Sequence, residues 1–430
     1  MHKGLLAGAV AGMGLLVSPD HLRLWGNLAG QLGPLFWFAA LGAVGLYALS
    51  ADGYNRLAAI RPVSGGYLEA LHRWGGEAAA ALALGSRLVL TLGLVTGVLV
   101  TAGFVFNETF VYWFPNFAFA FLWLAAVALS LLWGYRAAEK VQAGLLAVAL
   151  AGLAMLIVVG FWKMGVQPLA KVAPSSVATP GTLAGALLLF VGFDLGIQPS
   201  NRTNDPNKRL VGMRAALGIA LVFLGLWATI SLAHVPPDRL AGSFMPHTLA
   251  ARKIGGQTGR ILIGIVVIAG AGCASMALFS AVARMATTLA RLRLLPRFLE
   301  GSGQRNIPAV SLTAGSVAGL MAAGFAGQPE LEVFIRAGFL LWLLHIALVH
   351  LVAYRATQRY TSGSTDVQRR WQALLHIPAG LLAMAGTVCL WLVDEQRGSL
   401  TLYMLAAFFG TTAMLYAGRW TWPHQSSIEK

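Results

Sequence analysis

Charged residues are scarce in this sequence, at 11% of its 430 residues. A soluble protein of this size carries roughly a quarter of its residues as charges, because it must cover its surface in water. The sequence also lacks any long polar stretch in which a separate water-soluble domain could fold. A soluble enzyme is therefore excluded.

Cysteine is nearly absent as well. The two cysteines, Cys273 and Cys389, lie inside apolar segments, so the sequence indicates neither a disulfide framework nor a cysteine metal site. An integral-membrane enzyme would need a cluster of His, Asp, Glu or Cys at catalytic spacing, and these residues are few and scattered. His345 and His350 are not four residues apart, so they indicate no metal site, although one of them could titrate near neutral pH. No cofactor is expected beyond a coupling ion, either H⁺ or Na⁺.

Hydrophobic residues are abundant, at 57% of the chain. Apolar runs of about 20 residues recur from end to end, which is the length a helix needs to cross the hydrocarbon core of a bilayer. The sequence therefore predicts an all-α integral membrane protein with about twelve transmembrane helices. The predicted helices cover residues 4–20, 34–56, 78–104, 116–134, 139–162, 181–199, 211–234, 258–290, 308–327, 331–355, 371–394 and 398–418.

The net charge of +15 would suggest nucleic acid as the partner of a soluble protein. Here the twelve predicted crossings place both termini on one side, and most of the Lys and Arg residues fall on that side. This asymmetry follows the positive-inside rule, so we expect a multi-pass protein of the inner (plasma) membrane with cytoplasmic termini. Nucleic acid is not expected as a partner. Ala9-Val10-Ala11 could pass for a signal-peptide cleavage site, but the apolar stretch before it is too short.

Several short motifs occur in one order along the chain. They are Ala11-Gly12-Met13-Gly14-Leu15-Leu16-Val17-Ser18-Pro19, Arg61-Pro62-Val63-Ser64-Gly65-Gly66-Tyr67, Gly134-Tyr135-Arg136, Phe190-Val191-Gly192-Phe193-Asp194 and Leu294-Leu295-Pro296-Arg297-Phe298. Together they resemble the amino acid–polyamine–organocation (APC) superfamily of secondary transporters. The resemblance implies a LeuT-type fold with two inverted repeats, residues 1–162 (helices 1–5) and 163–356 (helices 6–10). Residues 357–430 would hold two peripheral helices and a short C-terminus.

The resemblance also implies that substrate binds near the membrane midplane, where helices 1 and 6 unwind. Paired glycines support this expectation, because Gly12 and Gly14 interrupt the first apolar segment and Gly192 and Gly196 the sixth. Free amides at such a break attract an anion, and free carbonyls attract an ammonium group or a cation. Alternatively, the glycines only allow helices to pack closely. The predicted substrate-binding residues are Val10, Ala11, Gly12, Met13, Gly14, Leu15, Leu16, Phe190, Val191, Gly192 and Phe193.

Within this set, the amides of residues 14–16 are expected to bind a carboxylate. The carbonyls of Val10, Ala11, Phe190 and Val191 are expected to bind an ammonium group. Phe190 and Phe193 would either close over the substrate or pack in the core.

Asp194 is the most informative single residue, because an ionisable group deep in a transmembrane helix is costly and usually functional. We expect it to couple proton movement to transport or to meet a substrate ammonium; the alternative is a structural acid that accepts hydrogen bonds from nearby backbone. Ser275 and Ser280 form a candidate ion site, as hydroxyls of this helix do in sodium-coupled members of the fold.

The remaining charges near helix ends point to structural roles. Arg87 and Arg336 lie near enough to helix ends to extend their guanidinium groups towards water. Asp52 and Arg56 stand four residues apart and can pair on one helix face, in a structural or a gating role.

Two departures from the family pattern bear on the substrate. Met13 replaces the small hydroxyl residue usual between the two glycines, which favours an apolar amino acid or a related amine. Residues 147–150 are apolar where some proton-coupled relatives carry a membrane-embedded Lys. The sequence therefore predicts a secondary transporter of an amino acid, with a small molecule and the bilayer as partners. An exporter or exchanger of the same fold, or a sensor that does not transport, remain alternatives, and the oligomeric state is not indicated.

Overall fold

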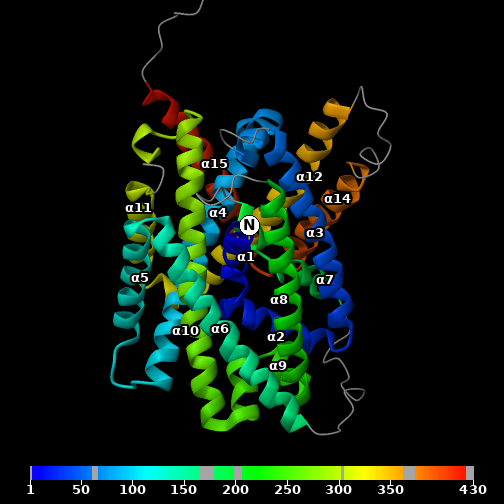
Figure 1. Cartoon of the computed structure of the whole chain (residues 1–430), viewed down its shortest axis with the longest axis vertical. Helices are drawn as coiled ribbons and strands as arrows, with labels where there is room; N and C mark the ends of the chain where they lie inside the picture. Colours follow the sequence, from blue (N-terminus) through cyan, green and yellow to red (C-terminus); the bar gives the residue numbers. More distant parts are fainter. Residues whose placement is uncertain are drawn as a thin grey trace, which may run out of the picture.

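The computed structural model describes residues 2–60, 66–164, 179–197, 206–301, 305–361 and 373–422. In these ranges the chain forms long helices, most of which run along the long axis of the molecule (Figure 1). Residues 61–65 of the second sequence motif lie outside the described residues.

The described residues of the first half of the chain form six helices, of which the first two are short and the other four are long. They are α1 (His2–Leu16), α2 (Pro19–Leu32), α3 (Leu35–Ile60), α4 (Gly66–Thr109), α5 (Asn116–Trp133) and α6 (Tyr135–Met164). The second half begins with three short elements, α7 (Pro180–Gly185), η2 (Ala186–Leu188) and η3 (Phe193–Ile197). It continues with α8 (Pro206–His234), α9 (Pro237–Ala241), α10 (Pro246–Arg291), η4 (Arg297–Leu299), α11 (Ile307–Ala322), η5 (Phe325–Gly327), α12 (Pro329–Thr361), α14 (His376–Val393) and α15 (Arg397–Trp420).

The described residues include 10 helical segments that are long and apolar enough to cross a membrane. The helix Ile307–Ala322 is a shorter apolar segment. The pair α1 and α2 supplies the first crossing in two pieces, so the prediction of about twelve transmembrane helices is confirmed. The helices α4 and α10 are longer than the spans predicted within them, because each begins with additional helical residues before the span. Each helix bends where the two parts meet, at Gly76 (φ 75°) in α4 and Gly256 (φ 58°) in α10.

Each helix of the first half packs against the second half in the same way as its counterpart in the second half packs against the first. The third crossing, α4, packs on the tenth, α12, and the eighth, α10, packs on the fifth, α6. Likewise the first crossing, α1, packs on α8, while the interrupted sixth packs on α3 through η2 and η3. This exchange of partners is the arrangement that two inverted five-helix repeats produce.

The last two crossings lie at the periphery. The helix α14 packs mainly on α12, and α15 packs on α4 and α12. Large apolar side chains on these helices, such as Leu381, Leu402 and Phe409, are exposed. A lipid environment accommodates such a surface, whereas water does not. The two peripheral helices therefore agree with the predicted fold.

Candidate functional site

The first crossing is interrupted at Val17 and Ser18, between α1 and α2. The Ser18 Oγ caps α2 by accepting a hydrogen bond from the His21 amide at 3.3 Å. Pro19 follows as the first residue of α2, a position that suits proline because the amide there has no partner within the helix. The prediction that helix 1 breaks at Gly12 and Gly14 is therefore wrong by a few residues: the capping signal Ser18-Pro19 sets the break.

Gly12 and Gly14 instead lie within α1 and allow close packing. A Cβ on Gly12 would lie 2.8 Å from the Phe193 carbonyl oxygen, and one on Gly14 would lie 2.6 Å from Gln142 Nε2. The amides of residues 14–16 belong to the last turns of a continuous helix, so their expected freedom to bind a carboxylate is also corrected. The free amides belong to the first turn of α2. The role of Val10, Ala11, Met13 and their neighbours in substrate binding stays a prediction.

The sixth crossing is interrupted as predicted. Its helical pieces α7 and η2 end at Leu188, and η3 begins at Phe193. Gly192 lies in the break with φ 95°, a conformation that glycine adopts without strain. A Cβ on Gly192 would lie 2.7 Å from the Leu15 Cβ, so the break in helix 6 touches the end of α1. The two interruptions are thus side by side.

Side chains from other helices bind the carbonyls that this break exposes. Trp25 Nε1 on α2 donates to the Leu189 oxygen at 3.1 Å. The Tyr47 hydroxyl on α3 donates to the Leu187 oxygen. Burial without such donors would cost free energy, so Trp25 and Tyr47 stabilise the break in this conformation. Sequence reasoning did not identify either residue.

Five aromatic side chains form a cluster around the break in helix 6. Phe190 contacts Trp25 with ring centroids 5.4 Å apart. Phe193 contacts Tyr47 at 5.1 Å and Trp342 at 6.2 Å. All five rings are fully buried. In this conformation Phe190 and Phe193 therefore pack in the core, which was one of their two predicted roles.

Asp194 on η3 lies at the centre of a buried polar cluster and is 0% exposed. Arg87 on α4 forms an ion pair with its Oδ2. Tyr54 on α3 donates to the same oxygen at 2.9 Å, and Trp342 Nε1 on α12 donates to Oδ1 at 3.2 Å. Three helices therefore hold one carboxylate. A guanidinium and two neutral donors offset its desolvation.

The prediction that Arg87 reaches towards water is wrong, because its side chain is only 1% exposed. The desolvation of an unpaired guanidinium is too costly in the bundle interior, so it pairs with the buried carboxylate. The signal for this pair was present in the sequence: two ionisable residues of opposite charge, each inside an apolar segment. The pattern does not say that the two segments are neighbours.

The other side of α1 faces α6 and α10. Gln142 Nε2 donates to the Val10 oxygen at 3.4 Å, which ties α6 to a carbonyl predicted to bind an ammonium group. The Ser275 Oγ on α10 donates to the Ala271 oxygen at 2.8 Å and is fully buried. Ser280 is partly buried on the same helix. The two serines as an ion site stay a prediction.

A pocket of about 550 Å³ extends to helix 6 at Leu188. Its polar wall includes Arg336 on α12 and the residues that follow α14. Arg336 forms an ion pair with Asp394 at 2.7 Å and donates to Gln396 at 2.8 Å. Arg336 therefore has specific partners at the mouth of this pocket.

Comparisons with known proteins agree with this arrangement. The family model described as amino acid permease matches residues 4–417. No curated protein sequence matches the chain. Among solved structures, the chain is similar to Mhp1, a nucleobase-cation-symport-1 family transporter in a closed conformation with bromovinylhydantoin bound. That likeness has a TM-score of 0.58 and 13% identity and covers 97% of this chain and 96% of the other.

A manganese transporter from Eremococcus coleocola is also similar, with a TM-score of 0.55 and 14% identity over 98% of this chain and 94% of that one. At such identities these likenesses show the fold alone, which is the LeuT-type fold predicted from the motifs. The match over nearly the whole chain, together with the paired breaks, identifies it as a member of the amino acid permease family, a multi-pass membrane transporter with a small-molecule substrate.

Proposed function

We propose that this permease moves an apolar, net-neutral amino acid or a related amine across the membrane by alternating access. The observation that carries the proposal is the pair of adjacent interruptions in helices 1 and 6, surrounded by apolar and aromatic side chains. Exposed peptide groups at such breaks suit a zwitterion, since amides face its carboxylate and carbonyls face its ammonium group. The aromatic cluster suits an apolar side chain.

The charge balance of the site supports a net-neutral substrate. Asp194 is paired with Arg87, so its charge is already compensated in this conformation. A polyamine or another multiply charged substrate would need several buried carboxylates to offset its desolvation. An amino acid whose side chain carries no charge has no such requirement.

Alternating access requires the aromatic cluster to open. Trp25 and Tyr47 must then release the carbonyls of residues 187 and 189, which makes those oxygens available to the substrate. The pocket beside Leu188 offers a route to this point from the side of the molecule where Asp394 lies. We propose that substrate enters or leaves there.

Asp194 is proposed as a coupling residue that acts only when its ion pair opens. A proton can reach its carboxylate only after the Arg87 guanidinium moves away, because Arg87, Tyr54 and Trp342 occupy the oxygens now. Protonation would therefore be linked to a rearrangement of α4 against η3. Ser275 and Ser280 remain the candidate sodium site for an alternative coupling ion.

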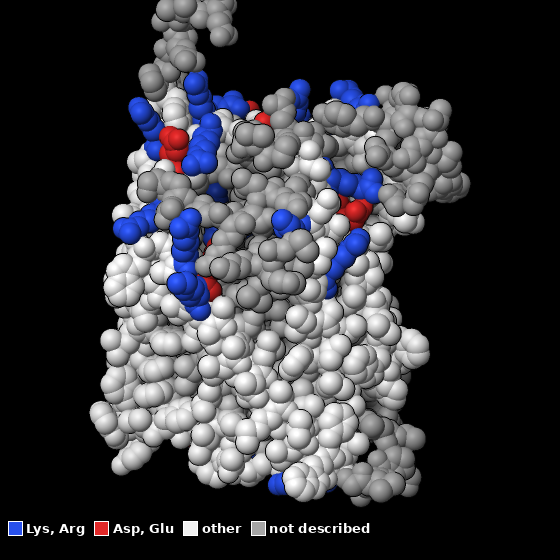
Figure 2. Space-filling model, in the orientation of Figure 1, with Lys and Arg blue, Asp and Glu red and all other residues white. Residues whose placement is uncertain are grey.

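The distribution of charge supports an inner-membrane location with cytoplasmic termini. Figure 2 shows Lys and Arg side chains gathered over the end of the molecule where α15 finishes, and few at the opposite end. Cytoplasmic loops carry an excess of such residues. We assign the basic end to the cytoplasm.

The proposal is tested in two stages with the purified protein. A thermal-shift screen against single amino acids and amines, with and without sodium, identifies the ligand; we expect stabilisation by apolar amino acids. Counterflow in proteoliposomes then measures exchange of that ligand. Binding without exchange would indicate a sensor, and exchange driven only outward by an imposed gradient would indicate an exporter. Stabilisation by none of these compounds would contradict the assignment of an amino acid or amine.

A further inference from the structure

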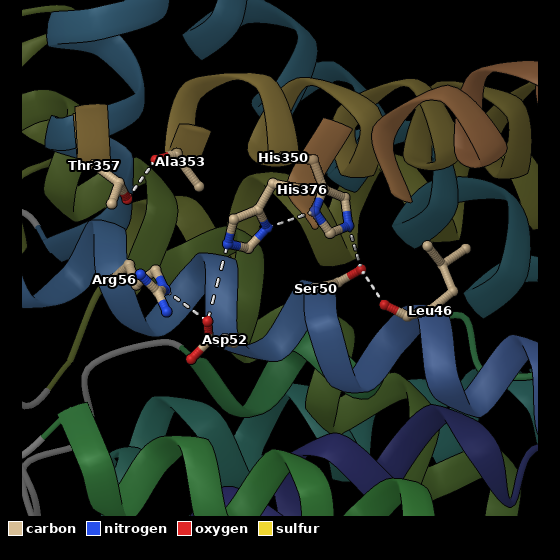
Figure 3. Close-up of polar contacts among 8 residues, drawn as sticks. All are labelled: Leu46, Ser50, Asp52, Arg56, His350, Ala353, Thr357 and His376. Atoms are coloured by element: carbon tan, nitrogen blue, oxygen red, sulfur yellow. Dashed lines mark hydrogen bonds and ion pairs between the residues drawn. The ribbon is translucent and has the colours of Figure 1, made fainter. Parts of the chain in front are cut away.

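A second polar cluster lies where α3, α12 and α14 meet (Figure 3). It contains two buried histidines, His350 on α12 and His376 on α14, which are 0% and 1% exposed. Their Nδ1 atoms are 2.9 Å apart. On α3, Ser50 lies beside the first histidine and Asp52 beside the second. The four side chains form a chain of contacts across three helices.

The hydrogen bond from Ser50 to Leu46 indicates which nitrogen carries a proton in the neutral pair. The Ser50 hydroxyl has one hydrogen, and it donates to the Leu46 oxygen at 3.0 Å. With that hydrogen on Leu46, we assign the hydrogen in the 2.9 Å contact between Ser50 Oγ and His350 Nε2 to Nε2. The Nδ1 of a neutral His350 is then an acceptor, so His376 Nδ1 must donate to it. This leaves His376 Nε2 with a bare lone pair.

That lone pair faces a negative charge. His376 Nε2 lies 3.9 Å from Asp52 Oδ2 and has no hydrogen-bond partner within the described residues. Two electron-rich atoms face each other there, and a proton on Nε2 would turn this contact into an attractive one. The side chain of Asp52 is 25% exposed, so water can deliver the proton.

Arg56 binds the same carboxylate oxygen. Its Nε lies 2.6 Å from Asp52 Oδ2, one helical turn along α3. Arg56 and a protonated His376 would therefore face the same oxygen, and the positive charge of Arg56 opposes a second positive charge on His376. While Arg56 binds Asp52, its positive charge disfavours a proton on His376. When Arg56 turns away, protonated His376 can bind Asp52 in its place.

Other elements around the pair add no further charge within the described residues. Helix α14 follows His376 with an apolar segment, and α7 next to it has the sequence PGTLAG. An apolar cavity of about 500 Å³ adjoins both histidines, and α4 contributes only Leu82 to it. Tyr354 on α12 is the other titratable residue in its wall. Asp52 and Arg56 therefore dominate the electrostatics of the pair.

A glycine lies beside each histidine. A Cβ on Gly53 of α3 would lie 3.4 Å from His376 Cε1, and one on Gly380 of α14 would lie 3.2 Å from the His350 Cβ. A Cβ at Gly53 would be in van der Waals contact with the His376 ring, and one at Gly380 would crowd the base of the His350 side chain. The backbones of α3 and α14 therefore approach the two histidines closely at these positions.

We propose that the His350–His376 pair is a proton-binding site that takes up one proton, on His376 Nε2, with Asp52 as its counter-charge and Arg56 as its competitor. The proton comes from water at the exposed edge of Asp52 and returns there. Its binding draws α14 towards α3. None of the four side chains contacts the carbonyls of the break or Asp194 in the hydrogen bonds described above, so the occupancy of the site can be measured without substrate and does not depend on the substrate proposed above.

The test is ¹⁵N NMR of the full-length protein, labelled at its 9 histidines and reconstituted in nanodiscs, recorded across pH. The spectra of neutral imidazoles distinguish Nδ1–H from Nε2–H. We expect His350 as Nε2–H, His376 as Nδ1–H, and a single protonation step for the pair between about pH 4 and pH 9. Resonances are assigned with His350→Gln and His376→Asn, and His234→Gln serves as a control that removes one unrelated signal.

Three variants make the test sharp. Asp52→Asn should lower the midpoint of the step by about one pH unit, and Arg56→Gln should raise it by about the same amount. His376→Asn keeps a donor to His350 Nδ1 but removes the second nitrogen, so the step should disappear while the His350 tautomer stays unchanged. Melting temperatures of the variants confirm that each is folded. Two independent protonation steps, the opposite tautomers, no step in this range, or midpoints that move in the same direction in both charge variants would overturn the proposal.

Discussion

Exchanging Asp194 for Asn and Arg87 for Gln, singly and together, measures the ion pair that links η3 to α4. Both side chains are almost fully buried, at 0% and 1% exposed. Removing one partner of such a pair leaves a desolvated charge and typically costs about 3–5 kcal/mol, whereas removing both charges is often nearly neutral. Each single variant should therefore lose stability, and the double variant should recover most of it.

The two single variants should not be equivalent. When Arg87 is replaced, Asp194 keeps the donors Tyr54 and Trp342. When Asp194 is replaced by Asn, Arg87 Nη2 faces a neutral amide in place of a carboxylate, and its Nε and Nη1 already lack partners among the described residues. Asp194→Asn should thus lie near the upper end of the range, about 5 kcal/mol, and Arg87→Gln near the lower end, about 3 kcal/mol.

Equilibrium unfolding in detergent gives these free energies, and a double-mutant cycle isolates the coupling. The control is Arg336→Gln, which breaks the partly exposed pair with Asp394 and should cost no more than about 1 kcal/mol. Transport in proteoliposomes across pH adds a second readout, because loss of pH dependence in Asp194→Asn is what a coupling role predicts. Additive single effects, with no recovery in the double variant, would refute the buried pair as a stabilising unit.

Two further predictions concern the breaks. Gly192→Ala should destabilise the protein by about 2–4 kcal/mol, because the added Cβ would lie 2.7 Å from the Leu15 Cβ and φ is positive. The control is Gly218→Ala on α8, which has nothing within 4 Å of the added Cβ and should be nearly neutral. Equal melting temperatures for the two variants would argue against the close approach. Trp25→Phe should cost about 1–3 kcal/mol, since it removes the donor to the buried Leu189 oxygen; an unchanged free energy of unfolding would show that this oxygen has another partner.

The sequence alone determined the class of protein and most of the fold. Apolar runs have a length that only a bilayer requires, and each run can be recognised independently of its neighbours. The spans beginning near 78 and 258 were located correctly because they are uniformly apolar, although the helices that precede them across Gly76 and Gly256 were not. The interruption at Gly192 was also predicted, because residues 190–194 resemble the family motif and their glycine pairs with those of the first segment.

Only the tertiary structure decided which residues face one another. The pairing of Asp194 with Arg87 spans 107 positions, and the contact of His350 with His376 joins α12 to α14 over 26 positions. Local patterns carry no information on the rotation of a helix about its axis, so an inward Arg and an outward one look alike in sequence. Glycine has two uses in membrane helices, unwinding and close packing, and the sequence does not distinguish them. The first break was therefore misplaced, because only the neighbours of Gly12 and Gly14 show that these glycines allow close packing.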